Sequence, residues 1–432
     1  MSKKTSINLI TLGCAKNSVD SEFLLGKLNQ DFFKISHTEV VEPCDFLLIN
    51  TCGFINDAKT ESINTILEGV RLKKEMKIKT LIVFGCLSQR YREELIKEIP
   101  EADHFFGVNE QHKIVSILKR DYFNFKNLIE NRILSTPKHY AYLKISEGCN
   151  RTCSFCAIPL IRGKYVSRTI ESLKQEAENL ASQGVKELIF IAQDLTFYGY
   201  DIYNKPSLSI LINTLSEIKG IKWIRLHYLY PRFITNELIR TIAENPKVCK
   251  YIDIPIQHIS DKMLSVMRRG TDKKNIIALL HKLREKIPEV AIRTTLLVGH
   301  PYETQKDFKE LCEFAKDFRF DRLGIFPYSH EEGTYSFKNF RNSIPKKEID
   351  RRVSEIMSIQ QTISFEINTS KIGSTKEILI DRKENELYIG RTQFDSPEID
   401  NEVIIKSKSM KTGGFYNVNI TDASEFDLFA EY

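Results

Sequence analysis

Glu147-Gly-Cys149-Asn-Arg-Thr-Cys153-Ser-Phe-Cys156 places three cysteines at a CxxxCxxC spacing, directly after the apolar run at 140–145. Thiolates are soft metal ligands, and cysteines this close on one loop are expected to converge on one metal centre. Three ligands close neither a tetrahedral zinc site nor a four-iron cubane, so one metal position stays open for a reactant. The alternatives are a zinc knuckle that lacks its fourth ligand and a chance cluster of cysteines in a loop.

The composition is that of an ordinary soluble globular protein with two or three domains. The chain has 432 residues, of which 42% are hydrophobic and 28% are charged. No run approaches the roughly 18 apolar residues of a membrane span. The apolar segment at 7–14 is too short and interrupted for a signal peptide, so we expect a cytoplasmic protein. Six of the nine cysteines fall at metal-like positions, which favours reduced thiolates over disulfides.

Residues 1–125 are expected to form a three-layer α/β domain around a parallel sheet. Three β-rich runs each end in a cysteine and are each followed by a helical pattern: Ile7 to Cys14, Asp45 to Cys52 and Leu81 to Cys86. Because the carboxyl ends of parallel strands meet at one edge of a sheet, the three thiols are predicted to lie together there. They are then candidate ligands of a second metal centre. The alternative is three small buried cysteines.

The remaining chain is expected to form a linker and two further domains. A polar linker at 126–138 precedes a partial (β/α)6 barrel at 139–367, because six β-like runs alternate there with helical segments. The CxxxCxxC loop falls at the carboxyl edge of this barrel, where such folds carry their chemistry. From 368 to 432, short alternating runs separated by Gly, Asn and Asp predict a small OB-like β-barrel.

This three-part order resembles the methylthiotransferases, a branch of the radical S-adenosylmethionine (SAM) enzymes, over nearly the whole chain. The resemblance implies two [4Fe-4S] clusters, each held by three cysteines, and a TRAM domain at 368–432. The first cluster is expected on Cys14, Cys52 and Cys86, and the second, whose open iron binds SAM, on Cys149, Cys153 and Cys156. SAM would serve as radical source and as methyl donor.

Several segments are similar to the group of this family that modifies an aspartate of ribosomal small-subunit protein twelve. The most diagnostic is Gly390-Arg-Thr-Gln-Phe-Asp-Ser-Pro-Glu-Ile-Asp400. The others are Ala192 to Asp194, Trp223 to Arg225, Tyr228 to Pro231, Asp253 to His258 and Met267 to Gly270. One departure is Gly299-His-Pro-Tyr-Glu303, where the family usually has Phe before the proline and Gly after it. This loop is expected to border the SAM pocket.

The charge distribution favours the same group. Residues 368–432 carry 8 Lys or Arg and 12 Asp or Glu, a net charge of −4, whereas the rest of the chain carries +10. A module that binds RNA is expected to be basic, because phosphate neutralisation dominates its affinity. An acidic module suits a basic partner such as a ribosomal protein. The alternative is an acidic surface that only aids solubility.

The expected reaction adds a methylthio group to the β-carbon of an aspartyl residue of that ribosomal protein, either free or in the ribosome. Its C–H bond is not acidic enough for an ordinary protein base, so radical chemistry is the expected route. The resemblance further implies a flavodoxin- or ferredoxin-like electron donor and a sulfur donor, and we expect a monomer. The rival hypotheses are a transfer-RNA adenosine methylthiotransferase with the same chemistry and a non-catalytic iron–sulfur scaffold.

Other residues are candidates with structural alternatives. Glu147 either orients the cysteine loop or is solvated, and Arg293 pairs either with the SAM carboxylate or with a structural Asp or Glu. Phe394 lies in a loop that either faces a partner or packs inside the protein. The candidates at strand ends, each with a structural alternative, are Gln193, Asp194, His258 and His300. The cysteines expected to be inert core thiols are Cys44, Cys249 and Cys312.

Overall fold

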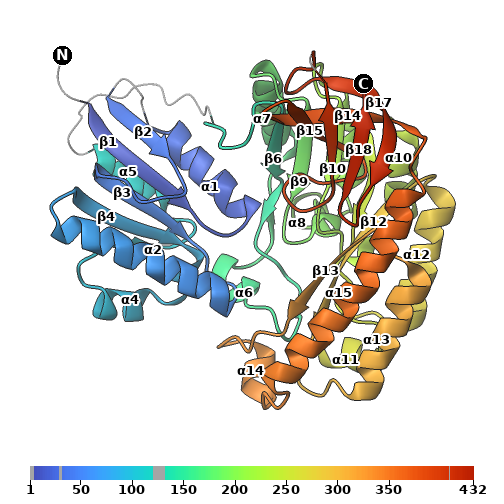
Figure 1. Ribbon diagram of the computed structural model, residues 1–432. Helices are drawn as coiled ribbons and strands as arrows, with labels where there is room; N and C mark the ends of the chain where they lie inside the picture. Colours follow the sequence, from blue (N-terminus) through green and yellow to red (C-terminus); the bar gives the residue numbers. More distant parts are fainter. Residues whose placement is uncertain (1–3, 29–31, 120–131, 408) are drawn as a thin grey trace. The chain divides into compact units, whose positions relative to one another are not determined.

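The computed structural model describes residues 4–28, 32–119, 132–407 and 409–432 (Figure 1). Its chain divides into two compact units. The first unit comprises residues 1–136, 147–150 and 157–165, and the second comprises residues 137–146, 151–156 and 166–432. The expected end of the first domain at residue 125 and the expected linker up to residue 131 lie outside the described residues.

The first unit contains a five-stranded parallel sheet in the order β2-β1-β3-β4-β5. Helices α1 and α5 cover one face and α2 and α4 the other (Figure 1), so the expected three-layer domain is confirmed. The strands are β1 (Thr5–Thr11), β2 (Phe33–His37), β3 (Cys44–Thr51), β4 (Ile78–Gly85) and β5 (His104–Phe106). The helices are α1 (Ala15–Gly26), α2 (Asn56–Lys74), α3 (Cys86–Arg90), α4 (Arg92–Glu98), α5 (Gln111–Lys119) and α6 (Ile158–Arg162).

Continuous apolar runs explain the central strands of this sheet. The middle residues of β1, β3 and β4 are buried, as expected where helices cover both faces. Strands β2 and β5 were not predicted from the sequence. Both lie at the edges of the sheet and are short and only partly buried, so they lack a continuous apolar run.

The second unit contains a six-stranded parallel sheet in the order β13-β12-β11-β10-β9-β6. The neighbours follow one another in chain order and helices connect them, so the expected partial (β/α)6 barrel is confirmed. The strands are β6 (Tyr140–Lys144), β9 (Glu187–Ile191), β10 (Trp223–Leu226), β11 (Val248–Asp253), β12 (Ala291–Val298) and β13 (Arg322–Pro327). Two short strands, β7 (Ser146–Glu147) and β8 (Val166–Ser167), flank the cysteine loop in the sequence.

Side-chain caps begin several helices of the partial barrel. Thr235, Asp272 and Thr304 each accept a hydrogen bond from the backbone N–H three residues on. These bonds satisfy donors that the first helical turn leaves unpaired. The helices of this unit are α7 (Ile170–Ser182), η1 (Leu195–Phe197), α8 (Tyr200–Tyr203), α9 (Leu208–Ser216), η2 (Pro231–Phe233), α10 (Asn236–Glu244), α11 (Asp261–Val266), α12 (Lys273–Lys286), α13 (Gln305–Phe318), α14 (Tyr335–Asn339) and α15 (Lys346–Thr369).

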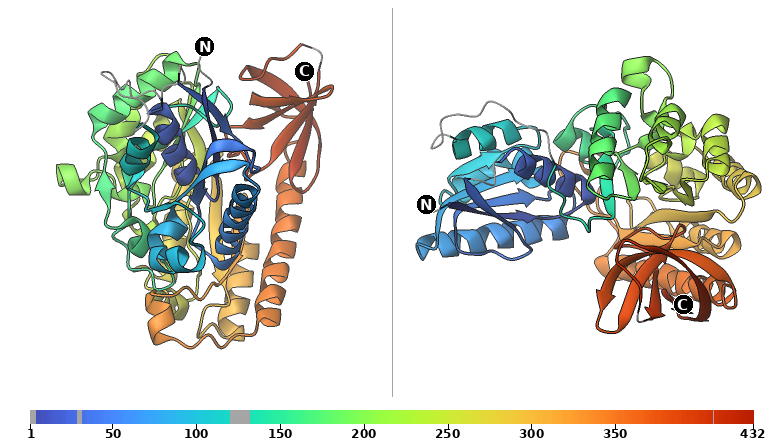
Figure 2. Two further views of the ribbon diagram at one scale, coloured as in Figure 1. Left: turned by 90° about the vertical axis from the view of Figure 1, so that its left-hand side faces the viewer. Right: turned by 90° about the horizontal axis from the view of Figure 1, so that it is seen from above.

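The long helix α15 leads into a closed five-stranded barrel in the order β14-β15-β16-β18-β17 (Figure 2). The strands are β14 (Thr375–Glu384), β15 (Leu387–Thr392), β16 (Glu402–Lys406), β17 (Phe415–Ala423) and β18 (Asp427–Glu431). The sequence predicts the first four. Strand β18, which was missed, pairs with β16 and β17 and so closes the barrel. Among the described residues, no helix combines the length and the apolar character needed to cross a membrane.

The loop from Gly299 to Glu303 connects β12 to α13. Two of its residues, His300 and Tyr302, differ from those usual in the family, and the backbone is left-handed at Tyr302. Tyr302 has a φ of 72°, a region that favours glycine. The family usually has glycine there, so the tyrosine keeps the backbone shape at a cost in strain. The ring of Tyr302 stays 56% exposed and packs edge-on against Phe340, with the ring centroids 5.2 Å apart.

His300, at the other unusual position, is fully buried and bridges two segments. Its Nδ1 lies 2.9 Å from the carbonyl oxygen of Pro301 and must donate, because a carbonyl only accepts. Its Nε2 therefore accepts from the hydroxyls of Ser336, at 2.9 Å, and Ser154, at 3.3 Å. Burial lowers the pKa of His300 to about 4, so the ring is neutral at pH 7. The histidine thus links the cysteine loop to α14.

Glycine at position 302 should give a more stable protein than alanine. We expect Tyr302→Gly to exceed Tyr302→Ala by about 1 kcal/mol in free energy of unfolding, because only glycine adopts this φ without strain. Denaturant titration of both variants measures the difference. At exposed, helical Lys309 the order should reverse, with glycine less stable by about 0.5–1 kcal/mol. The same order at both positions would contradict this account.

Acid should weaken the protein through His300. Its folded-state pKa of about 4 lies below the ordinary 6.5, so the unfolded state takes up the proton first. Stability contributed by the neutral ring is present above pH 6.5 and is lost as the pH falls towards 4, by on the order of 3 kcal/mol. Denaturation midpoints measured across this range should fall less in His300→Phe than in wild type. His112→Gln, at an exposed position of α5, should behave as wild type. Equal slopes in His300→Phe and wild type would refute the assignment.

Candidate metal centres

The three cysteines of the first unit follow three neighbouring strands, as the sequence predicts. Strands β1, β3 and β4 are adjacent, and Cys14, Cys52 and Cys86 come just after their carboxyl ends. The register pairs Thr51 with Gly85, so Cys52 and Cys86 follow directly paired residues. Cys14 is exposed at the start of α1, whereas the other two thiols are buried. One sheet edge therefore carries all three.

Glycines beside these cysteines let their loops approach closely. A Cβ added to Gly13, whose φ is 93°, would lie 2.9 Å from the sulfur of Cys52. A Cβ on Gly53 would lie 2.9 Å from the carbonyl carbon of Cys86. Neither distance is compatible with a side chain unless the backbone shifts. The backbone at Gly13 thus packs against the Cys52 side chain, and the backbone at Gly53 packs against the backbone at Cys86, so the three thiols lie within electrostatic reach of one another.

Burial and mutual repulsion raise the pKa of the Cys52 and Cys86 thiols and so keep these two protonated until a metal binds. Burial, which outweighs the opposing charge of Arg162 and is assisted by the nearby Cys14 and Cys52, raises the pKa of Cys86 to about 12. Burial also raises the pKa of Cys52. Metal binding would therefore release protons at this edge, as thiolate sites do generally.

No three His, Cys, Asp or Glu side chains within the described residues are placed to hold a single metal ion. Ligands of one zinc ion share a point about 2.3 Å from each sulfur. Cysteines that hold an iron–sulfur cluster each bind a different iron, so they do not share such a point. The three thiols at the sheet edge have the features expected of cluster ligands, because they are soft donors that lie near one another and follow separate strands.

Arg162, the last residue of α6, is a buried cation beside Cys86. Its Nη2 donates to the sulfur of Cys86, at 3.5 Å, and to Oδ1 of Asn17, at 2.6 Å. Its Nη1 donates to Asp20, at 3.1 Å, and to Glu147, at 2.9 Å. Glu147 therefore orients the start of the cysteine loop through an ion pair, the first of the two roles considered for it.

The CxxxCxxC loop contributes residues to both units. In the first unit, the backbone N–H of Cys149 donates to the carbonyl of Gly163, at 3.1 Å. In the second unit, the N–H of Cys156 donates to the carbonyl of Cys153, at 3.1 Å, and Ser154 donates to the carbonyl of Met267, at 3.0 Å. Backbone hydrogen bonds thus fix the segments that carry these cysteines.

A second buried arginine faces a cysteine of this loop. Arg269 is 4% exposed, and its Nη1 lies 3.2 Å from the sulfur of Cys153. Its other amino group donates to the carbonyl of Pro255, and its guanidinium lies over the ring of Tyr230, 4.5 Å from the centroid. The cation is held in place on several sides and directs an N–H at a thiol.

Asp194, after β9, has a structural role. It accepts from Nε of Arg151, at 2.8 Å, and from the backbone N–H of Thr196, at 2.9 Å. The second bond makes Asp194 the N-cap of η1. Arg151 in turn lies over the ring of Phe233, 3.9 Å from its centroid. The neighbouring Gln193 is half-buried. The structural alternative therefore accounts for Asp194.

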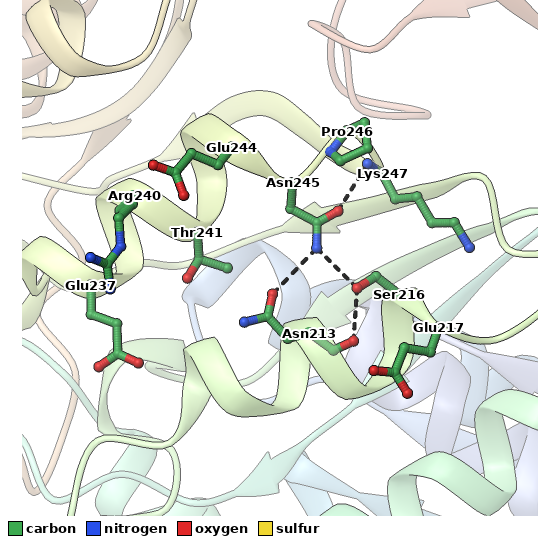
Figure 3. A pocket seen from close by; sticks show the side chains of 10 residues that line it. All are labelled: Asn213, Ser216, Glu217, Glu237, Arg240, Thr241, Glu244, Asn245, Pro246 and Lys247. Atoms are coloured by element: carbon green, nitrogen blue, oxygen red, sulfur yellow. Dashed lines mark hydrogen bonds between the residues drawn. The ribbon is translucent and has the colours of Figure 1, made fainter.

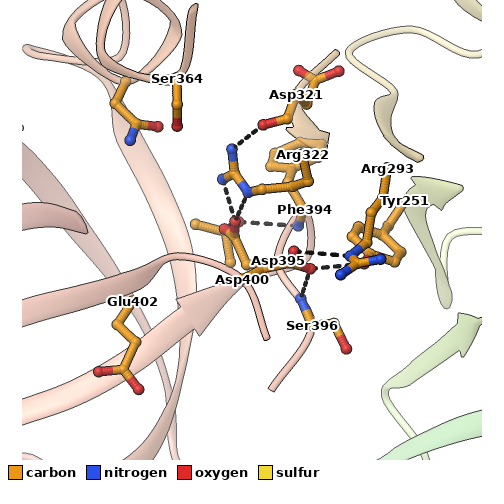
Figure 4. Close-up of polar contacts among 12 residues, drawn as sticks. Tyr251, Arg293, Asp321, Arg322, Ser364, Phe394, Asp395, Ser396, Asp400 and Glu402 are labelled. Carbon is orange, nitrogen blue, oxygen red and sulfur yellow. Dashed lines mark hydrogen bonds and ion pairs between the residues drawn. The ribbon is translucent and has the colours of Figure 1, made fainter. Parts of the chain in front are cut away.

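Arg293, expected to pair with an anion, faces carboxylates of this chain (Figure 4). Its Nε lies 3.3 Å from Asp400, and its Nη1 lies 3.7 Å from Asp253. Asp400 also accepts from the hydroxyl of Tyr251, at 2.7 Å. The structural pairing, rather than the SAM carboxylate, accounts for this arginine.

Most of the segment from Gly390 to Asp400 packs against the central sheet, and Glu398 and Ile399 are its exposed residues. Phe394 joins an apolar cluster with Trp223 and Tyr251. Asp395, fully buried, pairs with Arg322 (Figure 4). Although burial alone would raise the pKa of Asp395, the Arg322 guanidinium holds it below its usual range. The packing alternative for Phe394 is thus the right one.

Buried ion pairs extend this contact between the C-terminal barrel and the central sheet. Glu187, at the start of β9, lies between Arg225 and Arg391, and all three side chains are at most 2% exposed. Glu398 accepts from the hydroxyls of Tyr140, at 3.0 Å, and Tyr142, at 3.4 Å. These contacts lie on residues of the diagnostic segment and fix it in one position.

The remaining histidine and cysteine candidates are structural. Nδ1 of His258 accepts from the backbone N–H groups of Ile259, at 2.9 Å, and Ser260, at 3.0 Å, so the ring proton sits on Nε2, which faces Glu303. The three cysteines expected to be core thiols are buried, and burial raises the pKa of each to about 11 or 12: Cys44, Cys249 and Cys312.

A polar groove of about 620 Å³ lies between α9 and α10, on residues remote in sequence from every cysteine triad (Figure 3). Asn245 donates across it to Ser216, at 2.9 Å, and to Asn213, at 3.3 Å. The amides of Asn213 and Asn245 and the hydroxyl of Ser216 are thus engaged with one another.

Sequence reasoning missed Arg162 and Arg269 as neighbours of the thiols. Arg269 lies in the Met267–Gly270 segment that carries part of the family resemblance, which is a signal that could have found it. Arg162 follows the third cysteine of the loop by six residues and carries no periodic or compositional signal. Its role appears only when the fold brings it to Cys86.

Three family models match the chain in the expected order. They are the uncharacterized protein family UPF0004 at residues 6–107, the radical SAM superfamily at residues 143–315 and the TRAM domain at residues 372–432. Among solved structures, the radical SAM methyltransferase TsrM from Kitasatospora setae superposes with a TM-score of 0.55 at 11% identity and covers 75% of each chain. That likeness supports the fold.

Curated relatives match over almost the whole length. The ribosomal protein uS12 methylthiotransferase RimO of Cytophaga hutchinsonii is 50% identical over 431 residues, covering 99% of this chain and 98% of its own. The RimO of Bacteroides fragilis is 50% identical and covers 99% of both chains. With the radical SAM and TRAM regions in place, the chain belongs to the RimO family of radical SAM methylthiotransferases.

Proposed function

We propose that this protein adds a methylthio group to the β-carbon of an aspartyl residue of ribosomal protein uS12. The observation that carries the proposal is the meeting of Cys14, Cys52 and Cys86 at one sheet edge in a chain that also has the CxxxCxxC loop. Two sites, each with three thiols, suit two tasks: starting radical chemistry and delivering sulfur. The names of the relatives, at about half identity over the whole chain, support the substrate.

The residues at both triads fit iron–sulfur clusters. In our proposal Cys14, Cys52 and Cys86 hold one [4Fe-4S] cluster, and Cys149, Cys153 and Cys156 hold the cluster that binds SAM. When bound, these groups supply the radical that breaks an unreactive C–H bond, the sulfur and, from SAM, the methyl group. The fit rests on the donor chemistry. The thiols of the first triad meet at one sheet edge, those of the second follow the CxxxCxxC spacing, and each triad has a buried arginine directed at a sulfur.

The chain's own residues position the triads and balance their charge. Arg162 and Arg269 donate N–H groups to Cys86 and Cys153, which stabilises a thiolate over a thiol. His300 holds the cysteine loop through Ser154, while its neutral ring adds no charge near the second triad. Cys86 and Arg162 are both buried, so little water reaches their contact, and this strengthens it electrostatically.

The charge of the C-terminal barrel carries less weight for partner choice than the sequence indicates. Asp395 and Asp400 pair with Arg322 and Arg293, and Glu377 pairs with Lys222. These acids balance cations of the central sheet within the same unit. The preference for uS12 over transfer RNA therefore rests on the relatives rather than on the net charge of this module.

The surroundings of the reaction remain part of the proposal. Reductive chemistry requires an electron donor, which we infer to be flavodoxin- or ferredoxin-like, and a sulfur donor must refill the first site after each turnover. We propose that the protein acts in the cytoplasm as a monomer, on uS12 either free or in the ribosome.

A direct comparison of substrates tests the function. Anaerobically reconstituted protein with SAM, a reductant and sulfide should add the mass of one CH2S unit to an aspartate of uS12, detected by mass spectrometry of its peptides. Unmodified transfer RNA, offered in parallel, should stay unchanged. Addition to transfer RNA would overturn the substrate. SAM cleavage without an adduct on uS12 or transfer RNA would support the radical chemistry but refute uS12 as the substrate.

Cys52 and Cys44 lie at opposite ends of β3, so their variants compare a proposed cluster ligand with a structural thiol. Cys52 follows the carboxyl end of β3, and Cys44 begins the same strand at its opposite end. We expect Cys52→Ala to abolish uS12 modification and to lose about half of the bound iron, because one of two clusters is lost. Cys44→Ala should retain both iron and activity. Full activity of Cys52→Ala with normal iron would sink the role of the first site.

A further inference from the structure

Arg162 occupies a position that ion pairing alone does not explain. Its side chain is 1% exposed and ends α6, within the same unit as Cys14, Cys52 and Cys86. An arginine that serves only to bind a carboxylate usually does so with two parallel N–H bonds to one partner. Here the two amino groups of one guanidinium are divided between different kinds of acceptor.

The division separates charge balance from sulfur contact. Nη1 donates to Asp20 and Glu147, at 3.1 and 2.9 Å, which balances the buried charge. Nη2 donates to the sulfur of Cys86, at 3.5 Å, and to Oδ1 of Asn17, at 2.6 Å. Asn17 is itself fixed, because its Nδ2 donates to the carbonyl oxygens of neighbouring loops. The guanidinium is therefore held with one N–H directed at sulfur.

An N–H donor at a ligand sulfur stabilises the extra negative charge of a reduced cluster and so raises its reduction potential. We propose that Arg162 is a positioning residue that donates to the Cys86 sulfur and thereby raises the reduction potential of a cluster held by Cys14, Cys52 and Cys86. This inference rests on the proposed function and deepens it.

The backbone next to Arg162 keeps the donor in place. The carbonyl of Gly163 accepts from the N–H of Cys149, at 3.1 Å. A Cβ on Gly148 would lie 2.1 Å from the carbonyl oxygen of Lys164, so the two segments run in direct backbone contact. Residues 162–164 thus touch one cysteine from each triad. The first site and the start of the cysteine loop therefore both contact the segment 162–164.

The test measures a potential rather than turnover. Full-length protein carrying Cys149→Ala, Cys153→Ala and Cys156→Ala retains the first triad alone, so its iron signals report that site. Arg162→Gln, Arg162→Lys and Arg132→Gln are compared in this parent by EPR-monitored redox titration. Arg132 is the matched control, because it forms a buried ion pair with Glu22 in the same unit, with side chains 2% and 0% exposed.

We expect Arg162→Gln to shift the midpoint to a more negative potential, by about tenfold in the reduction equilibrium, or about 59 mV for a one-electron couple. Arg162→Lys keeps the positive charge on a shorter side chain and should shift the midpoint potential less. Arg132→Gln should not shift the midpoint potential. A parental potential in Arg162→Gln, or an equal shift in Arg132→Gln, would overturn the proposal.

Loss of iron leaves the inference decidable. If Arg162→Gln alone loses the cluster, Arg162→Lys decides: an intermediate potential supports the proposal and a parental one overturns it. If neither Arg162 variant retains iron while Arg132→Gln does, Arg162 is a structural requirement and the tuning role is overturned. A parent that assembles no cluster would instead refute the proposed metal site, so the two failures are distinguishable.

Discussion

Parallel strands end at the same edge of their sheet, and this constraint organises the chemistry of the first unit. Residues 14, 52 and 86 are far apart in the chain, yet β1, β3 and β4 are neighbours and deliver all three thiols to one edge. The glycines beside them remove the side chains that would hold the loops apart. Everything proposed for this site, from sulfur delivery to the contact with Arg162, depends on that convergence.

Charge balance in buried places is the second recurring feature. Arg162 and Arg269 each direct an N–H at a cysteine sulfur, and Glu187 joins Arg225 and Arg391 in the interior. Buried charges are tolerated because each has a partner, while removal of one partner would leave an uncompensated ion. The donors towards sulfur are thus anchored by neighbouring contacts before any metal arrives, which is what preorganisation of a cofactor site requires.

The fold was largely predictable because its signals are local. Apolar runs mark the strands that are covered on both faces, and helical patterns between them indicate the alternating order of each sheet. Strands β2, β5 and β18 escaped because they are short or only partly buried. The cysteine triads could be proposed from spacing and position. The arginines beside them could not, because their role depends on contacts between residues such as Arg162 and Cys86, 76 positions apart.

The segment from Gly390 to Asp400 shows how a correct pattern can carry a different physical meaning. It marks the family group in the sequence, and an acidic module was expected to attract a basic partner. In the structure Asp395 and Asp400 balance arginines of the central sheet, and Phe394 packs beside Trp223. The net charge of a module does not show which of its acids form ion pairs, so it could not reveal that Asp395 and Asp400 are paired with arginines of the same unit.

The make-up of the first unit bears on how such proteins can be dissected or recombined. Its compact body includes residues 147–150 and 157–165, which the chain supplies only after passing through β6. A fragment cut at the linker would keep Cys86 but lose Arg162. A chimera joined there would likewise combine the thiols of one parent with the guanidinium of another. The compact unit therefore does not coincide with one continuous stretch of sequence. A breakpoint after residue 165 keeps the Cys86 sulfur and the Arg162 donor in the same parent sequence.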